Sequence, residues 1–218
     1  MGEIFIVGAG TYGEVMCDLA QIIGYTVKGF YDEDKKKLGS SIMGVEVIGR
    51  FSELTSKDIK NKSFIVAIGN NEIRYEMMNR INLIGGSTPT LIHPTAIVSP
   101  TAIIGKGVYI QANAYIWTKA HIKDFCIISP GVIICHHSTV GYASLVSTHT
   151  SVGASIEIKD KVFIGMGSTI MTGVTTIGEN SIIGAGAVVT KNTDKYCVYA
   201  GVPAKKLREI EVSTSTSS

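Results

Sequence analysis

Two adjacent histidines, His136 and His137, stand in the segment VIICHHSTVG (132–141) among aliphatic and small residues. A neutral imidazole takes up protons near pH 7, so a positioned histidine can remove a proton from an amine or hydroxyl as it attacks an acyl group. This chemistry needs an acyl donor. A solvated surface pair and a zinc site with His121 and His149 remain alternatives, but no carboxylate or thiolate completes a local ligand set, so we predict no metal.

A second candidate site is the glycine-rich turn formed by Gly8, Gly10 and Gly13. The GxGxxG spacing allows the backbone to approach a phosphate, and the next helix supplies N–H donors at its N-terminus. Asp32 ends the following strand, where its carboxylate would accept a hydrogen bond from a ribose hydroxyl. The unit is short for a dinucleotide, so a mononucleotide or nucleotide sugar is favoured over NAD or NADP, and a purely structural turn remains an alternative.

These residues need elements that hold them in place. The pattern predicts a small α/β unit with a parallel sheet over residues 1–85, because short apolar runs alternate with helix-period segments. We expect strands at 4–7, 27–30 and 64–68, and helices at 14–23 and about 73–81. The turn and Asp32 then lie at the carboxyl ends of neighbouring strands, so the unit is Rossmann-like and suits nucleotide binding.

The chain changes character from Ile92 onward, because an aliphatic residue returns at every sixth position. A period of six fits neither an α-helix nor a hairpin sheet, and internal repetition of this kind indicates a solenoid. Three short strands per coil would build a triangular prism, in which each strand offers one large and one small residue to the interior. We therefore predict a left-handed parallel β-helix over 86–208, followed by a flexible tail at 209–218.

The six-residue phase also predicts where the histidines point. His136 and His137 occupy the second and third positions after the interior residue Ile134, so both side chains should project outward at a corner of the prism. The series gains one residue after Ile170, on the same edge and two coils further along, roughly 10 Å away at the strand spacing of a sheet. A groove bordered by the histidines and the segment 171–174 is the expected result.

Composition narrows the class of protein. Hydrophobic residues make up 45% and charged residues 17% of the 218 residues, and Lys plus Arg total 20 against 18 Asp plus Glu. No dense basic block occurs, so we expect no nucleic-acid partner, and no apolar run is long enough to cross a bilayer. The four cysteines are widely spaced, which predicts reduced thiols and a cytoplasmic location. The apolar composition favours an oligomer.

Several motifs together resemble one branch of the hexapeptide-repeat superfamily. The chain is similar over about residues 1–208 to the bacterial sugar acyltransferases typified by the sialic acid O-acetyltransferase and the bacillosamine-pathway nucleotide-amino-sugar N-acetyltransferases. The motifs that carry the resemblance are GAGTYGE (8–14), VAIGNNEIR (66–74), His93-Pro94, HHSTVG (136–141) and AGVPAKKL (200–207).

The resemblance implies a homotrimer with active sites between neighbouring prisms. Acetyl-CoA would lie along the β-helix, and the N-terminal domain would anchor a nucleotide-linked amino sugar. Among the residues that match family positions, His136 becomes the general base and His137 its catalytic neighbour. Cofactor contacts carry over to Met166 and Ala185, with Gly167, Gly184 and His149 around them. Substrate contacts carry over to Gly10, Thr11, Tyr12, Asp32, Asn70 and Arg74.

Two positions depart from the family pattern. The family usually follows its base with Glu or Asp, whereas this chain has His137, which cannot supply a fixed negative charge. A family histidine nine residues beyond the base is replaced by Leu145, and His149 is a candidate for part of its role.

The expected function is acetyl-CoA-dependent N-acetylation of the 4-amino group of a nucleotide-activated 4-amino-4,6-dideoxy sugar, for bacterial surface polysaccharide or glycoprotein glycan. O-acetylation of a sialic acid or related sugar is the alternative within enzymes. A non-catalytic scaffold that binds a nucleotide sugar is the alternative of another class. The sequence leaves open whether the nucleotide is UDP, dTDP or GDP, and it does not fix the configuration of the sugar.

Overall fold

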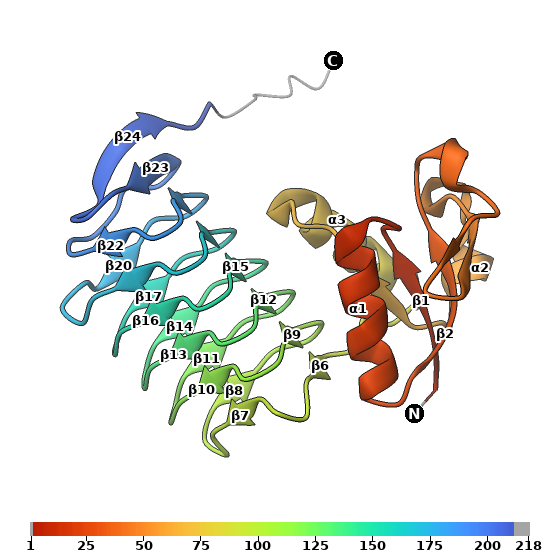
Figure 1. Cartoon of the computed structure of the whole chain (residues 1–218), viewed down its shortest axis with the longest axis horizontal. Coiled ribbons are helices and arrows are strands. Elements are labelled where there is room, and N and C mark those ends of the chain that lie inside the picture. Colours follow the sequence, from red (N-terminus) through yellow and green to blue (C-terminus); the bar gives the residue numbers. More distant parts are fainter. Residues whose placement is uncertain (1, 212–218) are drawn as a thin grey trace.

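The structure, a computed structural model, describes residues 2–211 and consists of an α/β domain beside a stack of short parallel strands (Figure 1). The N-terminal sheet has the strand order β3-β4-β2-β1-β5, in which only β3 is antiparallel to its neighbour. Its strands are β1 (Glu3–Val7), β2 (Thr26–Tyr31), β3 (Ser41–Ile42), β4 (Val45–Gly49) and β5 (Phe64–Val66). Its helices are α1 (Thr11–Ile22), α2 (Ser56–Ile59) and α3 (Asn71–Leu83), with 3₁₀ turns at Lys35–Lys37 and Phe51–Glu53.

The predicted alternation of strands and helices in this half is confirmed, but the segment between Asp32 and Ser63 holds elements that the periodicity missed. They are β3, β4, α2 and the two 3₁₀ turns. Each is at most five residues long, and a two-residue strand such as β3 has no measurable period. The pattern of apolar residues is therefore informative only for the longer elements.

The predicted β-helix is confirmed. Its strands form three stacked faces, in which every pairing is parallel except that between the last two strands of the first face (Figure 1). The first face contains β6 (Leu91–Ile92), β9 (Tyr109–Ile110), β12 (Ile127–Ile128), β15 (Leu145–Val146), β18 (Phe163–Ile164), β21 (Ile182–Ile183), β23 (Cys197–Ala200) and β24 (Lys205–Glu209). The second face contains β7 (Ile97–Val98), β10 (Tyr115–Ile116), β13 (Ile133–Ile134), β16 (Ser151–Val152), β19 (Thr169–Ile170) and β22 (Val188–Val189). The third face contains β8 (Ile103–Ile104), β11 (His121–Ile122), β14 (Thr139–Val140), β17 (Glu157–Ile158) and β20 (Thr176–Ile177).

We call the turns between the first and second faces the first corner, those between the second and third faces the second corner, and those between the third and first faces the third corner. Residues stack from coil to coil in register, as when Ile116 pairs with Ile134 and Ile134 with Val152. All three of these side chains are buried in the prism. The inserted residue after Ile170 is absorbed in the second corner, because Ile158 pairs with Ile177 instead of with residue 176.

Small polar residues complete the interior without leaving groups unpaired. The Ser138 hydroxyl donates to the Gly153 carbonyl at 2.7 Å and accepts from the Ile156 N–H at 3.0 Å, so it ties two coils together. Ser144 makes the equivalent bonds with Lys159 and Val162. A buried hydroxyl is tolerated because it is hydrogen-bonded.

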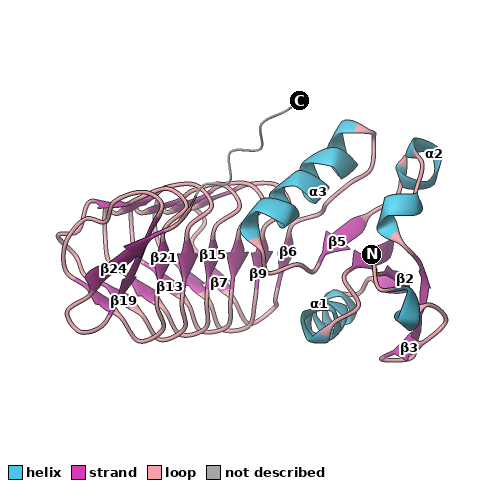
Figure 2. Ribbon diagram, turned by 90° about the horizontal axis from the view of Figure 1, so that it is seen from above, coloured by secondary structure: helices cyan, strands magenta, loops and turns pink. Residues whose placement is uncertain are grey.

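The N-terminal domain docks on the first face, with α3 alongside the coils in Figure 2. Arg74 is fully buried at this seam, and its guanidinium donates to the carbonyls of Ala143 at 2.6 Å, Phe125 at 3.2 Å and Ile68 at 3.1 Å. The first two carbonyls belong to the third corner and the last to the N-terminal domain. Burial lowers the pKa of Arg74, yet the hydrogen bonds give the cation partners. Arg74 therefore joins the two domains.

Further contacts support the same seam. The Val66 N–H donates to the Tyr109 hydroxyl at 2.9 Å, and the Asn71 side chain donates to the Lys161 carbonyl at 3.0 Å. Lys161 also pairs with Glu72 at 2.8 Å.

The C-terminal end differs in part from expectation. The tail predicted at 209–218 begins inside structure, because Glu209 ends β24 and the Ile210 N–H donates to the Tyr196 carbonyl at 2.7 Å. The remainder of the predicted tail, from 212 on, lies outside the described residues. Over residues 2–211, no helix is both long and apolar enough to cross a membrane.

Candidate active site

His136 and His137 lie in the second corner, and both are exposed, as the six-residue phase predicts. Their Nδ1 atoms are 3.0 Å apart and their rings are perpendicular at 88°. Trp117, one coil earlier, places its ring 6.2 Å from the His136 ring, and Tyr115 lies 5.4 Å beyond it. The rings of Trp117 and Tyr115 therefore flank the histidine pair on one side, and both histidines are otherwise exposed to solvent.

The residues expected at the acetyl-CoA site lie in the first corner. Met166 is 59% exposed, and its carbonyl accepts from the Gly186 N–H at 2.8 Å, so the neighbouring Ala185 stacks one coil above it. Gly167 has φ +66°, and a side chain there would meet nothing within 4 Å. Gly184 differs, since an added Cβ would lie 2.9 Å from the Ala200 Cβ. Gly167 thus leaves room for a ligand, whereas Gly184 is needed for coil packing.

The two corners are separated within one chain by the width of the second face. A stacked position in the first corner and His136 are six residues apart along a coil, which is roughly 20 Å of extended backbone. The described chain alone therefore does not bring His136 next to Met166.

His149 also lies in the first corner, not beside His136. Its ring covers Gly131, because a Cβ added to that glycine would be 2.5 Å from the His149 Nδ1. That His149 takes part of the role of the family histidine near the acetyl group stays a prediction, and within one chain His149 lies away from His136. It stays a candidate for cofactor contact, since Thr148 beside it accepts from the Gly167 N–H at 2.9 Å.

A cavity of about 370 Å³ lies between α1 and the first face. Tyr12 reaches it from the glycine-rich turn, and Phe163 reaches it from the first face. The Gln111 amide donates to the Tyr12 hydroxyl at 3.3 Å, and burial raises the pKa of this phenol. The cavity continues to Thr148, so it connects the turn with the first corner.

The three glycines of the turn have different structural roles. A Cβ on Gly13 would lie 2.1 Å from the Gly8 carbonyl oxygen, and one on Gly8 would lie 2.8 Å from the Ala67 carbonyl oxygen. Those two glycines are required for α1 to pack against the sheet. Gly10, the N-cap of α1, would meet nothing within 4 Å. It is exposed, and no packing contact explains it, so the space beside the helix N-terminus is open to an anion.

Asp32 is tied to the same turn. Its carboxylate accepts from the Ala9 N–H at 2.8 Å, the Asp34 N–H at 2.9 Å and Lys37 Nζ at 2.9 Å. Partial burial alone would raise the pKa of Asp32, but these hydrogen bonds outweigh it and hold the pKa below its ordinary value. A cavity of about 160 Å³ beside it includes Leu38 and Val47.

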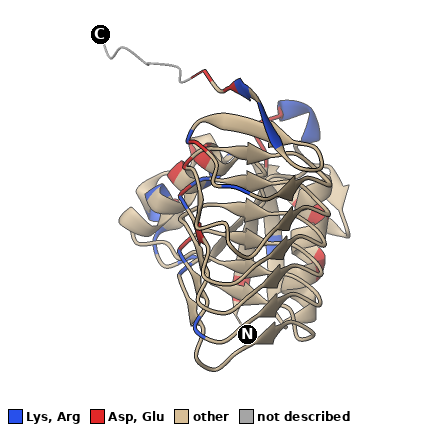
Figure 3. Cartoon of the chain, turned by 90° about the vertical axis from the view of Figure 1, so that its left-hand side faces the viewer, with Lys and Arg blue, Asp and Glu red and all other residues tan. Residues whose placement is uncertain are grey.

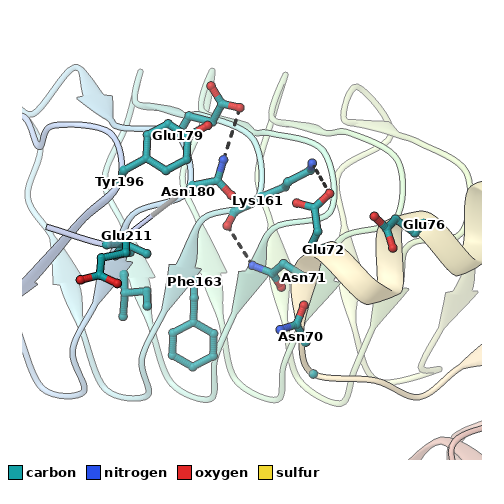
Figure 4. A pocket seen from close by; sticks show the side chains of 13 residues that line it. Asn70, Asn71, Glu72, Glu76, Lys161, Phe163, Glu179, Asn180, Tyr196 and Glu211 are labelled. Atoms are coloured by element: carbon teal, nitrogen blue, oxygen red, sulfur yellow. Dashed lines mark hydrogen bonds and ion pairs between the residues drawn. The ribbon is translucent and has the colours of Figure 1, made fainter. Parts of the chain in front are cut away.

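Asn70 lines a larger cavity of about 840 Å³ between α3 and the upper coils (Figure 4). Its side chain caps α3 by accepting from the Ile73 N–H at 3.0 Å. The walls of the cavity carry four carboxylates and one lysine, and that lysine is paired with Glu72. An anionic nucleotide would meet like charges here, so the cavity does not support a diphosphate contact for Asn70.

Arg74 requires a correction. The resemblance implies that it contacts substrate, but the structure buries its guanidinium completely and directs it to backbone carbonyls of both domains. The expected contact is wrong because no donor of this side chain faces an open cavity.

Sequence reasoning missed the other residues around the cavity beside Tyr12. Gln111, Ser129, Pro130 and Ser147 lie in the first corner, and they join Leu145, the position that corresponds to the family histidine, around this cavity. Their outward phase could be read from the hexads. Their significance depends on α1 docking there, which no local pattern reports.

Among residues 2–211, no group of three or more His, Cys, Asp or Glu side chains is placed to hold a metal ion. This holds for His136 and His137 in particular.

Comparison with known proteins supports the relationship suggested by the motifs. The family model of the PglD N-terminal domain matches residues 3–81, and that of the GMPPB C-terminal domain matches residues 87–176. GDP-perosamine N-acetyltransferase of Escherichia coli O157:H7 is 31% identical over 188 residues, which cover 84% of this chain and 76% of that protein. The chain spans only 28%, 43% and 31% of the lengths of three other curated relatives.

Two solved structures are similar over nearly their whole lengths. PerB from Caulobacter crescentus, in complex with CoA and GDP-perosamine, is 31% identical with a TM-score of 0.81, and the match covers 95% of this chain and 98% of that one. The acetyltransferase domain of PglB from Neisseria gonorrhoeae is 31% identical with a TM-score of 0.63, over 94% and 99% of the two chains. An α/β domain docked on a left-handed β-helix, with an outward histidine at a corner of the prism, defines a hexapeptide-repeat protein of the acyltransferase type. The chain belongs to the hexapeptide-repeat sugar acetyltransferase family that contains these proteins.

Proposed function

We propose that the chain transfers the acetyl group of acetyl-CoA to the 4-amino group of a nucleotide-activated 4-amino-4,6-dideoxy sugar. The observation that carries the proposal is the likeness to PerB, a structure with CoA and GDP-perosamine bound, across 95% of this chain. The enzyme would act in the cytoplasm on precursors of bacterial surface polysaccharide or glycoprotein glycan.

The nucleotide sugar would bind at the N-terminal turn. The open space at Gly10 and the N-terminus of α1 suit a diphosphate, with Thr11 and Tyr12 next to it. Asp32 keeps lone-pair capacity for a ribose hydroxyl beyond its three present hydrogen bonds. The small cavity beside Asp32, which Leu38 and Val47 line together with charged residues, suits the base.

Acetyl-CoA would lie along the first corner, where Met166 and Gly167 lie one coil before Ala185. The corner leads toward β24, which carries Lys and Arg residues at the C-terminal end of the helix (Figure 3). Basic groups there would attract the phosphates of the cofactor.

A homotrimer would complete the site, because His136 and Met166 lie in different corners of one chain. The exposed side of the prism supports an interface: Ile97 is 59%, Tyr115 39% and Trp117 36% exposed. Aromatic and aliphatic residues of this kind are typical of interface cores. The histidine corner of one prism would then face the first corner of its neighbour.

His136 would act as the general base. It would accept the proton of the sugar amine as the nitrogen attacks the thioester, while backbone N–H groups stabilise the oxyanion. Cys135 is not expected to form an acyl intermediate, because burial raises the pKa of its thiol and the thiolate is the reactive form. The transfer is therefore direct.

The test is acetyl transfer from acetyl-CoA to a panel of UDP-, dTDP- and GDP-linked amino sugars, followed by mass spectrometry for the gain of one acetyl group. His136→Asn should lower kcat by about 10²–10⁴-fold, the usual contribution of a general base. His121→Asn, an outward histidine on the third face, is the matched control and should keep full activity.

Undiminished transfer by His136→Asn would contradict the assignment. Binding of a nucleotide sugar without any acetylated product would favour the scaffold instead. Acetylation of sialic acid hydroxyls in preference to amino-sugar nucleotides would favour O-acetyltransfer.

A further inference from the structure

We propose that His137 is a positioning residue: its Nδ1 accepts a hydrogen bond from His136 Nδ1–H and so keeps the His136 Nε2 free to take the substrate proton. The inference rests on the proposed function. It assigns the role expected of a carboxylate to a neutral imidazole.

The first argument is the geometry of the pair. Two Nδ1 atoms at 3.0 Å cannot both present lone pairs to each other, so one of them must carry the hydrogen. In a neutral imidazole the ring that donates through Nδ1 has its lone pair on Nε2. The contact thus selects the one tautomer in which the donating ring is a base through its outer nitrogen.

The second argument decides which ring donates. Trp117 packs beside the His136 ring at 6.2 Å, so this ring is supported on two sides, by Trp117 and by His137. His137 has only the His136 ring as an aromatic neighbour among the described residues. The His136 ring is held by more contacts than the His137 ring, so it is the one suited to receive a proton at a fixed position. It is also the ring at the family position of the base.

The third argument is the charge around the pair. The five second-corner turns, 99–102, 117–120, 135–138, 153–156 and 171–175, contain no Asp or Glu. Lys119 occupies the position of His137 in the coil before, and Ser155 occupies it in the coil after. Glu157, the next carboxylate along the chain, is paired with Lys159. The chain itself therefore offers the His136 Nδ1–H a second imidazole, not an anion.

The proton balance is complete with this partner. The amine nitrogen forms the new C–N bond, its proton moves to His136 Nε2, and the C–S bond of the thioester breaks. The imidazolium keeps its Nδ1–H bond to the neutral His137 and returns the Nε2 proton to the CoA thiolate. No charge has to reside on His137.

The backbone at His137 allows a clean test. Its φ is +60°, close to the values of Lys119 at +55° and Ser155 at +58°, so this backbone conformation is a property of the turn and is not caused by the histidine pair. Glycine and asparagine both adopt this conformation readily. His137→Gly removes the acceptor without backbone strain, and His137→Asn keeps a side-chain oxygen that can accept from His136.

We expect His137→Gly to lower kcat by about 10–100-fold, the usual effect of losing an orienting partner, with KM for both substrates nearly unchanged. His137→Asn should restore most of the lost rate. Ser155→Gly, which introduces glycine at the equivalent turn position one coil later, should leave kcat unchanged. A rate for His137→Gly equal to that of the unmodified protein would overturn the proposal.

Nitrogen-15 NMR of histidine-labelled protein gives an independent readout in the resting state. His136 should be the Nδ1–H tautomer in the unmodified protein and in His137→Asn, and should shift toward the Nε2–H tautomer in His137→Gly. An Nε2–H tautomer of His136 in the unmodified protein would overturn the assignment of donor and acceptor. Absence of any acetylated product would refute the proposed function instead, and the NMR result would still decide the hydrogen bond.

Discussion

The first and second faces of the prism are built from the same hexads, but their outward residues differ in environment. Tyr109 is fully buried on the first face, whereas Ile97 and Tyr115 on the second face are 59% and 39% exposed. The difference arises because the N-terminal domain covers the first face. Polar groups on the covered side are already paired, as Arg74 is, and those on the open side, such as His136 and His137, are available to ligands.

Removing Arg74 should give the largest effect on stability. Arg74→Met leaves the buried carbonyls of Phe125 and Ala143 without their donor, and each such loss costs about 1–3 kcal/mol, so we expect a loss of about 2–6 kcal/mol in the free energy of unfolding. Urea titration measures it. Arg80→Met, an exposed site on the same helix, is the control and should change stability far less. Equal stability of both variants would mean that Arg74 does not hold the domains together.

Within the glycine-rich turn, Gly13 is packed against other residues whereas Gly10 is open to solvent. Gly13→Ala should destabilise the fold by about 2–3 kcal/mol, because the added Cβ overlaps the Gly8 carbonyl. Gly10→Ala should cost under about 1 kcal/mol, since only the N-cap preference changes, but it should weaken nucleotide-sugar binding measured by calorimetry. Unchanged binding would remove Gly10 from the site.

Two tyrosines on one coil compare the faces directly. Tyr109→Phe leaves the Val66 N–H unpaired in the covered seam and should cost about 1–2 kcal/mol. Tyr115→Phe, the same change on the open face, should stay within about 0.5 kcal/mol. Thermal unfolding of the two variants provides the measurement, and similar losses would contradict the difference between the faces.

Asp32 should give the smallest effect, which is recognised by its change with pH. Its folded-state pKa is lowered, so its stabilising contribution is complete above the ordinary carboxyl value of about 4 and is lost as pH falls through the folded value. Asp32→Asn should therefore lose less stability than the unmodified protein between about pH 5 and 2. Asp18→Asn, exposed on α1, should follow the unmodified protein. Parallel acid titrations of the two variants would refute the linkage.

Much of the fold follows from the sequence, because hexad repetition and the strand–helix alternation are local signals. The spacing also predicts that the side chains of His136 and His137 point outward. Met166 and Ala185 point outward too, in a different corner. The docking of α1 and α3 does not follow from any such pattern. Arg74 illustrates this: the resemblance implied a substrate contact, and only the three-dimensional structure shows that its guanidinium donates to carbonyls of both domains, among them those of Phe125 and Ala143.

The hexad phase also separates the two corners, because Met166 follows His136 by 30 residues, which is not a whole number of 18-residue coils. The same phase places His149 one coil after Gly131, but the position of Thr148 beside the Tyr12 cavity depends on the docking of α1. The function of these residues was therefore less predictable than their orientation.

The contacts between the two domains also affect the order in which parts of the chain are fixed during synthesis. Each coil pairs with one made 18 residues earlier, as Ile134 does with Ile116. Arg74 must wait for carbonyls 51 and 69 residues further along the chain. At about 5–20 residues per second, the N-terminal domain emerges several seconds before the coils that lock it. The first part made is thus fixed only after the third-corner turns at Phe125 and Ala143 have formed, and until then the Arg74 cation is still in water.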